Sequence, residues 1–317
     1  MELRDFGRLG QISALTLGGG GIAGVWGGTD RAEAIATVHA ALDAGITMLD
    51  LAPSYGADFE SERATAEALR LRPAPDVMIT SKVQLHDGGD LPNRIRHSLQ
   101  ASLTRLGRDH LDLLLLHTQL RRGGTTPPET VSPDDYRDEI VVAFEALRDE
   151  GLIRGWGITA VGDPTPIIDA FQHTPRPDAA QIVVNPLHQN GDLWIHGDTV
   201  RPDNPALIEA AASAGVAVSA IRVVAAGSLT STLDREVPST HPAAVDFARA
   251  EPYRKLAAEL GETPAALAHR YALTVPGVST VVLGVKNRTE LAECLAAEAR
   301  GPLTPDEMAA VTALTTR

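Results

Sequence analysis

Short apolar runs alternate with longer stretches of helical periodicity along this sequence, and this alternation constrains the fold more than any other feature. The apolar runs are nearly continuous, which is typical of parallel strands buried on both faces. They fall at 12–19, 47–52, 77–83, 111–117, 153–160, 179–185, 216–222 and 278–285. Helical patterns lie near 30–45, 61–72, 91–107, 135–151, 164–174, 205–215, 263–275 and 287–300. Eight strand–helix units in 317 residues predict an α/β fold of the (β/α)8 TIM-barrel class.

The composition does not change abruptly anywhere, so we expect one domain over residues 1–317. An extra helix is expected near 241–261, and a last amphipathic helix at 304–317 should pack outside the barrel. Three segments are longer than an ordinary connection between a strand and a helix: 118–134, 186–204 and 223–262. The first two should lie at the carboxyl end of the barrel, where (β/α)8 enzymes have their active sites.

Charge and cysteine content exclude several kinds of partner. The chain has 28 Lys and Arg against 41 Asp and Glu, a net charge of −13, which argues against nucleic acid or an anionic membrane as partner. The one cysteine, Cys294, cannot form an internal disulfide, which suits a reducing compartment. The N-terminal MELRDFGRLGQ lacks the apolar core of a signal peptide, and no apolar stretch has the length of a membrane helix. We therefore expect a cytoplasmic protein.

The four consecutive glycines at 18–21 allow two interpretations. Residues 19–24, GGGIAG, match G-x-G-x-x-G, and Asp50 ends the next strand about where a Rossmann fold carries a ribose-binding acid. That motif should open directly into a helix, whereas VWGG at 25–28 comes before Asp30. We therefore interpret the glycines as a flexible loop that lets a ligand approach the first strand.

Four polar residues fall at the carboxyl ends of three consecutive predicted strands. Asp50 ends the second strand and Tyr55 follows in the next turn; Lys82 ends the third strand and His117 the fourth. Because side chains alternate along a strand, the apolar neighbours of Asp50 and Lys82 face the helices while the two charged groups face the barrel interior. Each residue alone has an ordinary structural explanation, but an inward lysine is costly unless it is paired. Together the four residues predict one site.

This set predicts acid–base chemistry at Tyr55. A phenol has a pKa near 10, and an ammonium about 4 Å away at an effective dielectric near 20 favours the phenolate by up to about 4 kcal/mol. We therefore expect the phenol pKa to move toward 7, with Asp50 holding Lys82 charged and in place. His117 is expected to donate a hydrogen bond to the substrate oxygen. A proton donor to a developing alkoxide suits carbonyl reduction, which needs a nicotinamide cofactor for the hydride and no metal.

These motifs resemble those of the aldo-keto reductase superfamily. The resemblance covers nearly the whole chain and includes LDLAPSYG, TSKV and LLLLH around the four polar residues, the opening RLGQISALTLGG, and VVLGVKNRTELAE near the end. It implies a small hairpin that closes the bottom of the barrel, NADPH or NADH bound across the carboxyl face, and reversible reduction of aldehydes or ketones.

The resemblance also assigns cofactor residues on the nicotinamide side. Thr159 keeps a hydroxyl where the family often has Ser, and Gln181 matches the Gln that binds the nicotinamide carboxamide. Arg222 is expected to cover the cofactor or contact its phosphates, since a guanidinium is planar and cationic. Gly227 and Leu229 belong to a loop that resembles the backbone cradle of the pyrophosphate.

On the adenosine side the resemblance points to the start of the helix after the eighth strand. The residues assigned there are Gly284, Lys286, Glu290, Glu293 and Cys294. Backbone amides and the dipole of a helix start favour an anion, and Lys286 matches the position that meets the adenosine 2′-phosphate. Glu290 stands where Gln or Arg is common, and its carboxylate disfavours that phosphate. We expect NADPH, with NADH as the alternative.

The substrate pocket is expected on the rim loops, with Trp26, His86 and Trp194 as its residues, because the chain has few aromatics to spare. The expected substrate is a small-molecule carbonyl compound. Two other functions remain open on the same fold: an NAD-dependent sugar dehydrogenase of the aldose type, and a cofactor-binding subunit that uses nicotinamide as a redox signal.

Overall fold

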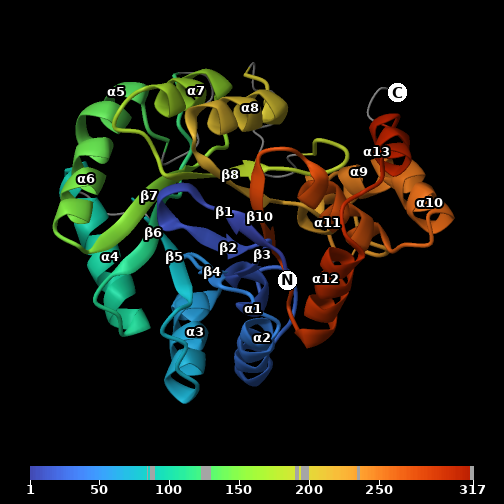
Figure 1. Ribbon diagram of the computed structural model, residues 1–317, viewed down its shortest axis with the longest axis horizontal. Helices are drawn as coiled ribbons and strands as arrows, with labels where there is room; N and C mark the ends of the chain where they lie inside the picture. The colour runs from blue at the N-terminus through green and yellow to red at the C-terminus, as the bar shows by residue number, and fades with distance from the viewer. Residues whose placement is uncertain are drawn as a thin grey trace.

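The eight barrel strands close into one parallel barrel with helices around it (Figure 1). The structure is a computed structural model and describes residues 1–83, 85, 90–122, 130–189, 193, 200–233 and 236–314. The strand order around the barrel is β10-β3-β4-β5-β6-β7-β8-β9, and every neighbouring pair is parallel. The predicted fold class is therefore confirmed.

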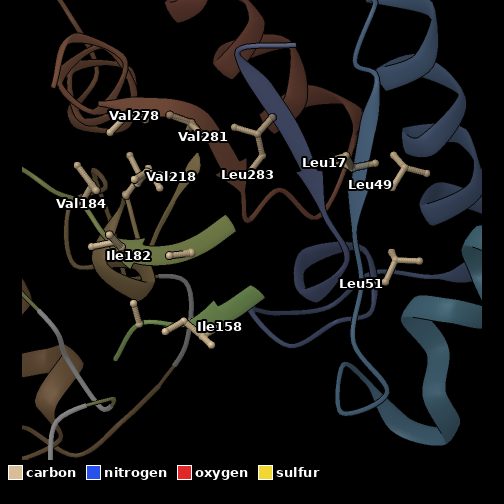
Figure 2. Packing of buried hydrophobic residues seen from close by; sticks show 14 of the residues in the cluster. Leu17, Leu49, Leu51, Ile158, Ile182, Val184, Val218, Val278, Val281 and Leu283 are labelled. Atoms are coloured by element: carbon tan, nitrogen blue, oxygen red, sulfur yellow. The ribbon is translucent and has the colours of Figure 1, made fainter. Parts of the chain in front are cut away.

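The strands lie close to their predicted positions. Their bounds are β3 (Leu15–Gly18), β4 (Met48–Asp50), β5 (Met78–Val83), β6 (Leu111–Leu116), β7 (Ile153–Thr159), β8 (Ala179–Val183), β9 (Ala217–Ile221) and β10 (Val278–Leu283). Their outward side chains pack under the helices as one apolar layer, part of which Figure 2 shows. The residues labelled there include Leu17, Leu49, Leu51, Ile158, Ile182, Val218 and Leu283.

The helices begin at residues that satisfy their first backbone amides. Asp30, Thr263 and Thr304 each accept a hydrogen bond from the helix that follows, as N-cap residues do. The helices are α1 (Gly19–Ile22), α2 (Arg31–Asp43), α3 (Glu60–Leu71), α4 (Leu91–Leu106), α5 (Pro133–Asp135), α6 (Val141–Asp149), α7 (Pro164–Gln172), α8 (Asn204–Ala214), α9 (Pro242–Arg249), α10 (Glu251–Glu259), α11 (Pro264–Thr274), α12 (Arg288–Arg300) and α13 (Pro305–Thr312). The single extra helix expected near 241–261 is thus two, α9 and α10, which meet at Ala250. Among the described residues, no helix has the length and apolar character needed to cross a membrane.

A hairpin closes the amino-terminal end of the barrel, as the resemblance implied. It consists of β1 (Leu3–Asp5) and β2 (Gln11–Ser13), so the strand predicted at 12–19 is in fact β2 followed by β3. Phe6, Leu9 and Ile12 of this segment are buried and form one apolar cluster with inward residues of the strands. The inward residues in that cluster are Met48, Met78, Leu113, Leu115, Ala179 and Ala217.

The glycines at 18–21 are packed tightly, and the expectation of a flexible loop is wrong. A Cβ added to Gly18 would lie 2.2 Å from the Leu283 carbonyl oxygen, and one added to Gly21 would lie 2.1 Å from that of Val285. Both distances are far inside van der Waals contact, so only glycine lets the end of β3 and helix α1 pass this close to the end of β10 and to Val285 beyond it. The closed barrel also excludes the Rossmann alternative for this motif.

Candidate active site

Three neighbouring strands bring Asp50, Lys82 and His117 to the carboxyl end of the barrel. Asp50 ends β4, Lys82 is the penultimate residue of β5, and His117 directly follows β6. Met48 precedes Asp50 by two residues, Met78 precedes Lys82 by four, and Leu113 precedes His117 by four. All three apolar residues belong to the inner cluster. Because side chains alternate along a strand, the three polar side chains also face inward.

The buried centre of the site is an ion pair between Asp50 and Lys82. The Lys82 Nζ donates to Asp50 Oδ2 at 2.8 Å and to the Leu51 carbonyl oxygen at 2.8 Å. The exposed fractions of the two side chains are 0% and 2%. A buried lysine is retained only when its charge is neutralised and its protons are bonded, and both conditions hold here.

Tyr55 reaches this pair because of the turn that follows β4. Gly56 has a φ of +78°, and a Cβ there would lie 2.6 Å from the Ala23 carbonyl oxygen, so the turn requires glycine. The Lys82 Nζ lies 4.7 Å from the centroid of the Tyr55 ring. The His117 ring meets the same ring edge to face, with centroids 5.7 Å apart. The four residues predicted from the sequence therefore lie together.

The pKa of Tyr55 moves in the direction opposite to the one expected. Burial raises it, and the nearby Asp50 charge adds to that effect, while the charge and hydrogen bond of Lys82 lower it and Arg222 lowers it further. The net shift is upward. The cost of burying a phenolate outweighs the attraction of Lys82, on which the expected downward shift depended. Tyr55 is consequently protonated at neutral pH.

Burial also sets the charge states of Lys82 and His117. Burial alone lowers the pKa of Lys82, but the Asp50 charge and the Tyr55 hydroxyl more than offset it, and the pKa is raised. Burial and the Lys82 charge lower the pKa of His117 to about 3. At neutral pH the site therefore contains an ammonium, a carboxylate, a neutral phenol and a neutral imidazole.

Gln181 makes a contact that the sequence did not predict. Its Nε2 donates to Asp50 Oδ1 at 2.7 Å, and Gln181 is 3% exposed. Its neighbour across the strands is Thr159, at the carboxyl end of β7. The Thr159 Oγ1 is buried without a hydrogen-bond partner in the described structure, so a polar donor or acceptor is available beside Gln181.

Trp26 and Arg222 meet above the barrel end. The Arg222 guanidinium lies 4.9 Å from the centroid of the Trp26 ring. A Cβ on Gly20 would come 3.2 Å from the Trp26 Nε1, and one on Gly284 would come 3.6 Å from it, so the indole covers the ends of β3 and β10. Arg222 has a left-handed φ of 55°, and its carbonyl oxygen accepts from Asn185 Nδ2 at 3.2 Å. Asn185, whose side chain holds the Arg222 backbone at this end of the barrel, was not identified from the sequence.

The loop after β9 has an unusual run of left-handed backbone. Ala225, Ala226 and Gly227 have φ values of 46°, 54° and 92°, and Leu229 is fully buried below them. The N–H groups of Ala225, Gly227 and Leu229 donate to the carbonyl oxygens of Arg222 and Val224 at 2.8 to 3.1 Å, so they are used within the turn itself. The pyrophosphate-binding role expected of Gly227 and Leu229 stays a prediction.

The two cationic side chains near the start of α12, Lys286 and Arg288, are each paired with a carboxylate. Lys286 Nζ lies 2.9 Å from Glu290 Oε1, and the Lys286 amide donates to Glu290 Oε2 at 2.9 Å. The Arg288 guanidinium and amide both donate to Glu33, whose pKa this arginine lowers to about 2. Glu33 was not identified from the sequence, since it is 255 positions away from Arg288 and no local pattern links them.

The remaining predicted residues fall into two groups. Glu293 accepts a hydrogen bond from Thr263, and the buried Cys294 Sγ lies 3.6 Å from His269 Nε2, so both side chains contact α11 or its N-cap. His86 and Trp194 lie outside the described residues.

A closed parallel barrel with an acid–base set at its carboxyl end has the arrangement of a (β/α)8 enzyme. The chain belongs to the aldo/keto reductase family, whose model matches residues 14–316. It is 28% identical over 303 residues to an L-galactose dehydrogenase of Arabidopsis thaliana, covering 94% of this chain and 88% of that protein. It is 33% identical over 132 residues to the methylglyoxal reductase YeaE of Escherichia coli (strain K12), covering 41% and 40%.

Solved structures show the same fold. The holo form of the aldo-keto reductase AKR11C1 from Bacillus halodurans matches with a TM-score of 0.73 and 23% identity, covering 96% of this chain and 92% of that one. The glycerol dehydrogenase AKR11B4 from Gluconobacter oxydans matches with a TM-score of 0.72 and 25% identity, covering 97% and 92%.

Proposed function

We propose that this protein interconverts a small-molecule carbonyl compound and its alcohol with a nicotinamide cofactor, and that Tyr55 transfers the proton. The observation that carries the proposal is the buried Lys82, which is bonded to Asp50 and lies 4.7 Å from the centre of the Tyr55 ring. A fully buried charge aimed at a phenol is costly for stability alone and useful for acid–base catalysis.

Each residue has a role that follows from its charge state. Tyr55 is protonated at neutral pH because burial raises its pKa, so it can donate to the substrate oxygen during reduction. Lys82 stabilises the phenolate that remains, and Asp50 keeps Lys82 in position. His117 is neutral, since its pKa is about 3, and a neutral imidazole offers an N–H that orients the substrate oxygen without competing for its proton.

The residues beside the site suit a nicotinamide dinucleotide, which when bound supplies or accepts the hydride. Thr159 offers a buried hydroxyl with no partner in the described structure, and Gln181 stands next to it. Arg222 stacks on Trp26 near the ends of β9 and β3, and together they can cover one side of the cofactor.

For the cofactor we infer a preference for NAD(H), against the sequence-based expectation of NADPH. Lys286 was the reason for that expectation, and Glu290 binds both its ammonium and its amide. Glu33 binds Arg288 in the same way. A 2′-phosphate would have to displace the carboxylate from each cation. The phosphate would then lie beside the displaced carboxylate, and the repulsion between these two negative charges opposes its binding.

Exchange of these carboxylates tests the cofactor preference. In Glu290→Gln, the ratio of NADP⁺ to NAD⁺ affinity measured by calorimetry should rise by about tenfold, the value of one freed charge-assisted hydrogen bond. Glu251→Gln, which breaks the exposed pair with Lys255 on α10, is the matched control and should leave the ratio unchanged. Tighter binding of NADP⁺ than of NAD⁺ by the native protein would refute the inference.

Oxidation of a sugar or polyol is the second candidate. It is favoured by the L-galactose dehydrogenase relative, which aligns over 94% of this chain, and by the glycerol dehydrogenase structure. Steady-state rates with all four nicotinamide cofactors over a panel of aldehydes, ketones, sugars and polyols will distinguish the two candidates.

The role of Tyr55 is tested by Tyr55→Phe. This change should lower kcat by about 10²-fold or more while cofactor affinity stays within about threefold. Tyr271→Phe, on α11, removes a hydroxyl outside the set and should change neither quantity. Unchanged turnover in Tyr55→Phe would remove Tyr55 from its role. Cofactor binding by the native protein with no turnover on the whole panel would favour the redox-sensing alternative.

A further inference from the structure

The two oxygens of the Asp50 carboxylate are held from opposite sides of the barrel. Oδ2 accepts from Lys82 on β5 at 2.8 Å, and Oδ1 accepts from Gln181 on β8 at 2.7 Å. In the closed strand order, β4 and β8 are separated by three strands in either direction, so the Gln181–Asp50 bond crosses the barrel interior. Asp50 is 2% exposed and Gln181 is 3% exposed, so water does not compete for this contact.

We propose that Gln181 is a positioning residue that acts through Asp50: its amide fixes the orientation of the carboxylate, which in turn places Lys82 beside Tyr55. The inference rests on the proposed function. A carboxylate bonded through one oxygen can rotate about its Cβ–Cγ bond, and Lys82 would follow the oxygens. With Oδ1 held by Gln181, the carboxylate is oriented so that Oδ2 faces Lys82.

An amide is the chemical group that this position requires. A second cation at 181 would share the Asp50 charge and weaken its hold on Lys82, and a carboxylate would repel Asp50. A neutral N–H donor fixes Oδ1 and leaves the charge balance of the pair unchanged. One N–H of Nε2 donates to Asp50, so Gln181 can still meet a bound carboxamide through Oε1 or through its second N–H, and the two roles are compatible.

Two substitutions separate positioning from packing. Gln181→Leu keeps the approximate volume and removes the donor. Gln181→Glu keeps an acceptor oxygen for the cofactor and replaces the donor by an acid, which donates to Asp50 only while it is protonated. Two buried carboxyl groups this close share a proton at low pH and lose it as the pH rises. The other titratable or charged groups that face this pair are Lys82 from β5, Tyr55 after β4, His117 after β6 and Arg222 after β9.

The experiment measures kcat against pH for the native protein and both variants, with cofactor affinity and thermal unfolding as accompanying measurements. We expect Gln181→Leu to lose about tenfold in kcat at every pH. Gln181→Glu should lie within about threefold of native near pH 6 and fall by about tenfold or more toward pH 9, with a midpoint that the native profile lacks. Its cofactor affinity should stay within about threefold of native across that range. Gln100→Leu, on the exposed face of α4, is the matched control and should follow the native profile.

Two results would overturn the inference. One is native-like kcat at all pH values in both variants, and the other is an equal, pH-independent loss in both, which indicates disturbed packing alone. These outcomes are distinct from failure of the proposed function, which would appear as no turnover in the native protein or as unchanged turnover in Tyr55→Phe.

Discussion

Removal of the buried cation gives the most direct test of the proposed chemistry. In Lys82→Met, Tyr55 loses a positive charge 4.7 Å from its ring centre, which at an effective dielectric of about 20 corresponds to about 3.5 kcal/mol. If all of this stabilisation develops in the transition state, kcat for carbonyl reduction falls by about 400-fold. The pKa of Tyr55 should rise further, since Lys82 now lowers it. Steady-state reduction rates at neutral pH measure the loss in kcat, and a rate profile extended above pH 10 measures the rise in the Tyr55 pKa.

A folding control is essential for this variant, because Lys82→Met leaves the Asp50 carboxylate buried without its cation. Breaking a buried pair in this way costs about 3–5 kcal/mol. The double variant Asp50→Asn, Lys82→Met removes both charges and should unfold at a higher temperature than Lys82→Met while remaining as inactive. A folded Lys82→Met protein that keeps kcat within about tenfold of native would refute the electrostatic role of Lys82.

Three further predictions concern packing, pH and charge. Gly21→Ala should lower the unfolding temperature strongly, because its Cβ would lie 2.1 Å from a backbone carbonyl oxygen. Gly28→Ala is the control and should not lower it, because a Cβ there would have nothing within 4 Å. Equal unfolding temperatures of the two variants would contradict this prediction. The pKa of His117 is about 3, so His117 should not titrate near its usual pH of about 6.5. His117→Gln should therefore leave the shape of the kcat–pH profile near pH 6.5 unchanged. Arg288 lowers the pKa of Glu33 from 4.5 to about 2, so this pair stabilises the fold above pH 4.5 and loses that contribution as the pH falls toward 2. The unfolding temperatures of native and Glu33→Gln proteins should therefore converge in that range, and a difference that is independent of pH would contradict the assignment.

The sequence predicted the convergence of Asp50, Lys82 and His117 because strand alternation and barrel closure are fixed by local geometry. It did not predict that Asp50 is bonded to Gln181, 131 positions away, since no local pattern specifies contacts across a barrel. The direction of the Tyr55 pKa shift was also wrong, because burial depends on how the finished barrel end packs. Local periodicity therefore determines which residues face the site, whereas long-range packing determines their pKa values and partners.

The charge balance of the site explains why a raised phenol pKa is useful. At neutral pH the Asp50 and Lys82 charges cancel, and Tyr55 and His117 are neutral, so these four groups have no net charge before substrate binds. Under the proposed function, negative charge then develops on a substrate oxygen beside four groups whose own charges cancel. In that proposal the Tyr55 proton and the Lys82 ammonium neutralise it. A phenol with a lowered pKa would spend part of its time ionised and unable to donate, whereas the buried Tyr55 keeps its proton until such charge appears.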